Sequence, residues 1–63
     1  MITLTRLNQV EVVINCDLIE SIESTPDTIV TLTTSKKLSV RESVDDVVSK
    51  VVAYKKRLAE TSL

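Results

Sequence analysis

The sequence contains no glycine, although a chain of its kind must reverse direction several times. Glycine reaches positive φ angles without steric cost, so it is the usual residue in tight hairpin turns. An average composition would give a chain of this length about four glycines. Each turn must therefore be wider than a two-residue hairpin turn, or must hold a residue with a side chain at a positive φ angle.

Alternating apolar residues predict five short strands in the first two thirds of the chain. The expected ranges are 2–7, 10–15, 18–24, 29–33 and 37–41. The side chains that we expect to face the core are Ile2 and Leu4, then Val10, Val12 and Ile14, and then Leu38 and Val40. Glu20 and Glu23 are expected to face water.

The links between these strands carry different turn signals. Asn8-Gln9 has the length of a two-residue turn, but Gln9 tolerates positive φ at a cost, so a strained or longer turn is the alternative. A short helical turn is an option around residues 17–20, where Asp17 is suited to cap it. Residues 25–28, Thr-Pro-Asp-Thr, fit a type I turn with proline in second place. For residues 34–36 we expect an exposed loop of three or more residues built on a type I turn.

A helix is predicted over residues 43–60, where apolar residues recur at spacings of three and four. Its apolar residues are Val44, Val47, Val48, Val51, Val52, Tyr54 and Leu58. Ser43 is a good N-cap, and the basic residues 55–57 lie where the helix dipole favours positive charge. The valines cover a wide arc, so one side of the helix is expected to pack on the sheet and another on a neighbouring subunit.

These elements predict a single α+β domain over residues 1–63. A small antiparallel sheet of about five strands, within residues 2–41, is followed by one C-terminal amphipathic helix, at 43–60. A domain of this size buries only about 60% of its unfolded surface and usually needs further support. Cys16 is the only cysteine, which excludes an intrachain disulfide, and we expect it to be a packed thiol. Self-association is the remaining source of support, so we expect a homo-oligomer, for example a ring.

The charge and composition argue against several classes of function. Eight basic residues against nine acidic ones give a net charge of −1. This charge argues against nucleic-acid binding, which requires an excess of basic residues to neutralise the phosphates. Histidine is absent, so the commonest general base is missing, and there is no glycine-rich phosphate loop. We therefore expect no enzyme activity and no metal or cofactor. No signal peptide and no membrane-spanning run are present, which favours a cytoplasmic protein.

Without a catalytic set, the candidate functional residues are those suited to contact a partner or a second copy. They are Arg6, Lys36, Lys37, Val48, Val52, Tyr54 and Lys55. The basic residues among them lie near predicted turns or the helix end, and the valines with Tyr54 belong to the helix pattern. The sequence leaves open whether Lys36 and Lys37, or the run 55–57, touch a partner at all.

Three segments carry a resemblance to a known family. They are the opening ITLTRLN, the middle LIESIESTPDTIVTLT, and KKLSVRES running into a valine-rich helix that ends in YKKRL. Together they resemble the FlbD/SwrD family of small flagellar motility proteins over residues 2–58. The family pattern usually has glycine in two turns, at the places taken here by Gln9 and Ser35, so these departures affect turn geometry.

The resemblance implies a non-enzymatic accessory of the flagellum. Members are associated with swarming and with the power that the motor delivers through its stator units. The expected partners are therefore a second copy and a flagellar motor or stator protein, at the inner face of the membrane with at most peripheral contact. The alternative is a small β-rich RNA-binding translational regulator, against which stand the net charge and the lack of aromatic residues for stacking.

Overall fold

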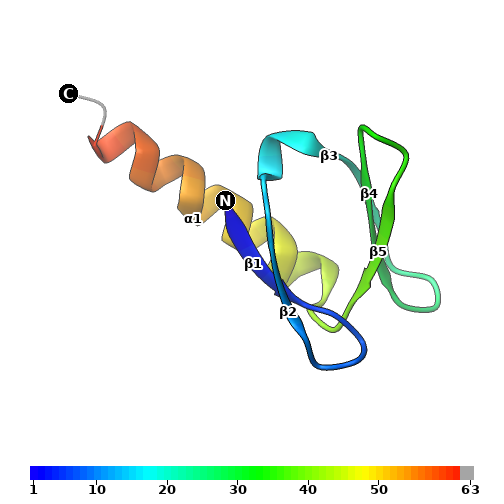
Figure 1. Cartoon of the computed structure of the whole chain (residues 1–63). Helices are drawn as coiled ribbons and strands as arrows, with labels where there is room; N and C mark the ends of the chain where they lie inside the picture. Colours follow the sequence, from blue (N-terminus) through cyan, green and yellow to red (C-terminus); the bar gives the residue numbers. More distant parts are fainter. Residues whose placement is uncertain (62–63) are drawn as a thin grey trace.

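The structure, a computed structural model, describes residues 1–61 and the side chains of residues 1–59 (Figure 1). Its strands are β1 (Ile2–Thr5), β2 (Glu11–Ile14), β3 (Ile19–Glu23), β4 (Thr28–Leu32) and β5 (Lys37–Val40). A short 3-10 helix, η1 (Cys16–Leu18), joins β2 to β3, and the helix α1 (Val44–Thr61) follows β5. The predicted α+β class and order of elements are confirmed.

The five strands form two small antiparallel sheets rather than one. One sheet is the β1–β2 hairpin, and the other has the order β3-β4-β5. The sheets meet where β1 ends and β5 ends, through a bridge between Arg6 and Val40 and a 2.8 Å hydrogen bond from the Arg41 N–H to the Thr5 carbonyl. Away from this junction the sheets splay apart, and the core lies between them (Figure 1).

The core takes side chains from both sheets and from the helix. Its buried apolar members are Ile2, Leu4, Ile14, Cys16, Val30, Leu38, Val40 and Val47. The predicted inward faces of β1 and β5 are thereby confirmed, as is the packed thiol of Cys16. Val10 was wrongly predicted to face the core, because it precedes β2 in the hairpin link and is 56% exposed.

Two predicted links differ from the structure. The type I turn at residues 25–28 was wrong: the Thr25–Pro26 peptide is cis, residues 25–27 form an open bend, and Thr28 already begins β4. The last β3–β4 pair joins Glu23 to Ile29, so the loop is wider than a four-residue turn. The short helical turn begins one residue earlier than predicted, because Asn15, not Asp17, caps it. The Asn15 side chain accepts the Asp17 N–H at 3.0 Å.

Helix α1 begins as predicted, with the Ser43 hydroxyl accepting the Asp46 N–H at 3.1 Å. Val47 is fully buried, and Val44, Val51 and Tyr54 are half-buried behind the sheets. Leu58 lies on the same helix face but is 49% exposed, because the last turns of α1 run past the sheets (Figure 1). The described helix continues to residue 61, close to the predicted end at 60, and the basic run 55–57 lies just before its last turn.

Candidate interaction surfaces

The structure divides the seven predicted contact residues between two surfaces. Arg6, Lys36 and Lys37 come together beside the two hairpin loops, although thirty residues separate them in the chain. The other four, Val48, Val52, Tyr54 and Lys55, all lie on α1. Val48, Val52 and Lys55 follow one another at spacings of four and three on an exposed side of the helix, whereas Tyr54 lies on the side that packs against the core.

The β1–β2 hairpin positions Arg6. Its loop closes through a 2.9 Å hydrogen bond from the Gln9 N–H to the Arg6 carbonyl, and the Arg6 N–H donates to the Val10 carbonyl at 2.9 Å. Gln9 has a φ angle of 73°, so the loop is a turn followed by a left-handed residue rather than a two-residue turn. The Asn8 side chain also accepts the Val10 N–H at 3.0 Å.

The β4–β5 hairpin repeats this geometry and positions Lys36 and Lys37. The Ser35 N–H donates to the Leu32 carbonyl at 2.9 Å, and the Leu32 N–H donates to the Lys36 carbonyl at 2.8 Å. Ser35 has a φ angle of 71°. The expected loop of three or more residues is confirmed. Each hairpin loop thus has a non-glycine residue, Gln9 or Ser35, at the position where the positive φ angle favours glycine.

Between β2 and the tip of the β4–β5 hairpin lies an apolar groove with a basic rim. It measures about 260 Å³, and its apolar lining comes from Val12, Val13, Ile14, Leu18, Leu32 and Leu38. Arg6 and Lys36 line the same groove, and Arg6 also borders a neighbouring hollow with Lys37. We call this surface, with Arg6, Lys36 and Lys37 around the apolar lining, the basic groove. The sequence pattern did not single out Leu18 and Leu32 as part of such a surface.

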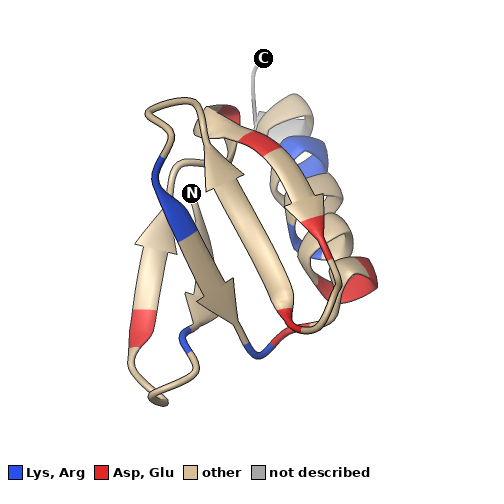
Figure 2. Ribbon diagram, turned by 90° about the vertical axis from the view of Figure 1, so that its right-hand side faces the viewer, with Lys and Arg blue, Asp and Glu red and all other residues tan. Residues whose placement is uncertain are grey.

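The basic groove is not neutralised by the protein itself. Within the described part of the chain, the side chains of Arg6, Lys36 and Lys37 make no ion pair and no hydrogen bond. The acidic residues of β3 lie at the opposite edge of the three-stranded sheet from Lys37 of β5 (Figure 2). A protein with an overall charge of −1 therefore presents one locally basic surface with an apolar floor.

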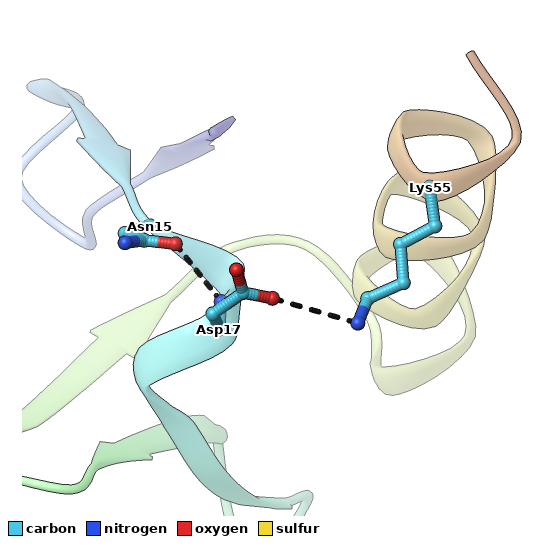
Figure 3. Close-up of polar contacts among 3 residues, drawn as sticks. All are labelled: Asn15, Asp17 and Lys55. Carbon is cyan, nitrogen blue, oxygen red and sulfur yellow. Dashed lines mark hydrogen bonds and ion pairs between the residues drawn. The ribbon is translucent and has the colours of Figure 1, made fainter. Parts of the chain in front are cut away.

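The helix residues differ in how much they can offer a partner. Val48 and Val52 are 46% and 59% exposed, whereas Tyr54 is half-buried and packs against the core. The Nζ atom of Lys55 lies 3.5 Å from Oδ1 of Asp17, and the Asp17 N–H donates a hydrogen bond to the Asn15 side chain (Figure 3). Both charged side chains are well exposed, so this ion pair contributes little to stability.

Glu42 has a structural role that the sequence pattern did not reveal. Its two carboxylate oxygens accept the Thr5 N–H at 2.9 and 3.0 Å, which ties β1 to the segment between β5 and α1. Partial burial acts to raise its pKa, but the hydrogen bonds, chiefly from Thr5, and the nearby Lys50 together lower the pKa below the ordinary value of 4.5. The carboxylate is therefore ionised at neutral pH and fixes the junction of the two sheets.

No group of three or more metal-binding side chains occurs among the described residues. Among the described residues, no helix combines the length and the apolar character needed to cross a membrane.

Comparison with protein families gives one match. Residues 1–59 match the family described as FlbD, flagellar and swarming motility proteins. Searches of curated proteins and of solved structures give no match. Since the family match spans nearly the whole chain, this protein belongs to the FlbD family of flagellar and swarming motility proteins.

Proposed function

We propose that this protein is a non-enzymatic adaptor that acts on the flagellar motor, through its stator units, to support motor power and swarming. The observation that carries the proposal is the family match over residues 1–59. FlbD proteins are motility accessories and are not known as enzymes. The protein would work in the cytoplasm, at the inner face of the membrane beside the motor.

The basic groove is the surface that we assign to the motor protein. Its rim of Arg6, Lys36 and Lys37 has no acidic partner within the described chain, and its floor is apolar. A motor segment that carries carboxylates beside an apolar side chain would complement both features, because the charges would steer it and the floor would bury its apolar part.

The adaptor is proposed to act as a homo-oligomer. Among the residues whose side chains are described, eight apolar ones are buried in the core, while Val48 and Val52 stay exposed on the helix. Small domains of this kind are commonly supported by self-association.

No arrangement of residues favours the alternative of an RNA-binding regulator. The only aromatic residue, Tyr54, is half-buried on α1 and does not line the basic groove. Single-stranded RNA is usually bound by exposed aromatic side chains on which bases stack, and the basic groove has none.

The proposal is tested by capture of motor proteins from cells that express a tagged copy in place of the native one. We expect wild type to retain stator proteins and to restore swarming to a deletion strain. The double variant Arg6→Glu/Lys36→Glu should lose both, because it reverses the charge at the rim.

Arg41→Glu is the matched control, since Arg41 is also an exposed basic residue but follows the other end of β5. It should behave as wild type. Wild type that retains no motor protein, or a groove variant that swarms normally, would refute the proposed function.

A further inference from the structure

The solvent-exposed side of α1 carries a short stripe of residues that the folded monomer leaves unused. Asp45, Val48, Val52 and Lys56 follow one another at spacings of three, four and four, so they lie along one face of the helix. All four are exposed, with Val48 at 46% and Val52 at 59%. We call these four residues the outer stripe.

The monomer gives no reason for valines at these two positions. Valine is a poorer helix former than alanine, because its branched side chain loses rotamer freedom in a helix. The core face of α1 is supplied by Val47, Val51 and Tyr54. The outer valines therefore weaken the isolated helix while burying little surface in this chain.

The charges at the two ends of the outer stripe are opposite and unpaired. Asp45 lies in the first turn of α1, and Lys56 lies three turns later. Neither side chain has an ion pair or a hydrogen bond within the described residues. The outer stripe thus has an apolar centre between an acidic end and a basic end. A second copy in the antiparallel orientation would place its basic end opposite the acidic end of the first, so the stripe is complementary to itself.

We infer that α1 pairs with the α1 of a second copy, antiparallel and about a two-fold axis, through the outer stripe. Val48 of each copy then faces the Val52 position of the other, and Asp45 faces the Lys56 position, so each contact occurs twice. This inference rests on the homo-oligomeric form proposed above and specifies its surface. The contact closes at two copies, so it predicts a dimer and not a ring.

The pairing leaves the basic groove free. The groove is built from β2, η1 and the β4–β5 hairpin, and no residue of the outer stripe lines it. One dimer would therefore present two basic grooves to the motor. Contact along a few helical turns lies at the small end of specific interfaces, so we expect an affinity in the micromolar range or weaker.

The test is the mass of the purified full-length protein by sedimentation at concentrations up to about 1 mM, the weak limit of specific binding. We expect wild type to reach the dimer mass. Asp45→Lys and Lys56→Glu should each weaken dimerisation by about tenfold or more, because two facing charge pairs become repulsive. An equimolar mixture of these two variants should dimerise again, since their altered charges complement each other.

Asp46→Lys is the matched control: it places the same charge change in the same helical turn, on another side of the helix. It should dimerise as wild type does. Val52→Ala is a second variant that separates pairing from folding. It should weaken the dimer while leaving the helix intact or more stable, because alanine is the better helix former.

Four results would overturn the inference: a wild-type monomer over the whole concentration range, an assembly larger than two copies, equal loss in Asp45→Lys and Asp46→Lys, or a mixture that does not recover. If the protein is a monomer but still captures motor proteins, the helix pairing is rejected and the adaptor role is retained. If it is a dimer but captures no motor protein, the adaptor role is rejected and the helix pairing is retained.

Discussion

Replacing Gln9 and Ser35 by glycine should stabilise the protein. Each residue is the left-handed member of a hairpin loop, with φ angles of 73° and 71°. A residue with a Cβ atom loses about 1–2 kcal/mol in this conformation. Glycine removes that strain but has more freedom in the unfolded chain, which offsets about 0.5–1 kcal/mol. The net gain should be about 0.5–1 kcal/mol at each site.

The two loops are closed by separate sets of hydrogen bonds with no residue in common, so the double variant should gain roughly the sum, about 1–2 kcal/mol. In a domain of this size, 1 kcal/mol raises Tm by about 4–8 °C. Thermal unfolding followed by circular dichroism, together with urea titration, would measure the change.

Three controls isolate the backbone effect. Gln9→Ala and Ser35→Ala keep the Cβ atom and should give no gain. Thr34→Gly lies in the second loop but not at a positive φ angle, so it should destabilise by about 0.5–1 kcal/mol. The reasoning is wrong if Gln9→Gly and Ser35→Gly are no more stable than the corresponding alanine variants.

Three further substitutions test the packing and the polar contacts. Glu42→Gln should lower the free energy of unfolding by about 1–2 kcal/mol at neutral pH, because the charged acceptor for the Thr5 N–H is lost. Since the folded-state pKa of Glu42 is lowered, the stability it contributes is present above the ordinary value of 4.5 and is lost as pH falls below it. Urea titrations of both proteins should therefore converge in acid, and a constant gap would contradict the assignment. Val47→Ala should cost about 2 kcal/mol or more in the same titration, since Val47 is fully buried, and a cost below about 0.5 kcal/mol would argue against its place in the core. Lys55→Ala should change the free energy of unfolding by less than about 1 kcal/mol, because its ion pair with Asp17 is exposed. A larger loss would show that this ion pair contributes more to stability than an exposed pair should.

The core faces could be predicted from the sequence because strand and helix periods are local properties. Ile2 and Leu4 alternate on β1, and Val44, Val47 and Val51 recur on α1, so each period identifies a buried face. The predictions failed at the ends of elements. Val10 and Leu58 fit their periods but are 56% and 49% exposed, because burial also depends on how the sheets and the helix meet.

The loops show the same division between local and distant effects. The lack of glycine indicated that the hairpin turns were unusual, and Gln9 and Ser35 carry that strain. The turn at residues 25–28 fitted type I by residue type, but β3 and β4 end their pairing at Glu23 and Ile29, which leaves a wider loop. The residue preferences of residues 25–28 carry no information about where the pairing of β3 with β4 ends.

The sequence predicted which residues belong to the candidate surfaces, but not how these residues are grouped in space. Arg6 and Lys36 share one groove because the Arg6–Val40 bridge brings the two sheets together. Such a bridge joins segments far apart in the chain, and no local pattern records it. The apolar residues Leu18 and Leu32 were missed as groove residues for the same reason.

The central claim is that the basic groove couples this protein to the flagellar motor. It is tested most directly by the torque of single motors in tethered cells that carry either wild type or Arg6→Glu/Lys36→Glu in place of the native copy. Matched expression and folding of the two proteins would be verified first. We predict that the groove variant lowers torque to the level of the deletion strain while Arg41→Glu gives wild-type torque. Full torque with the groove variant would contradict the claim.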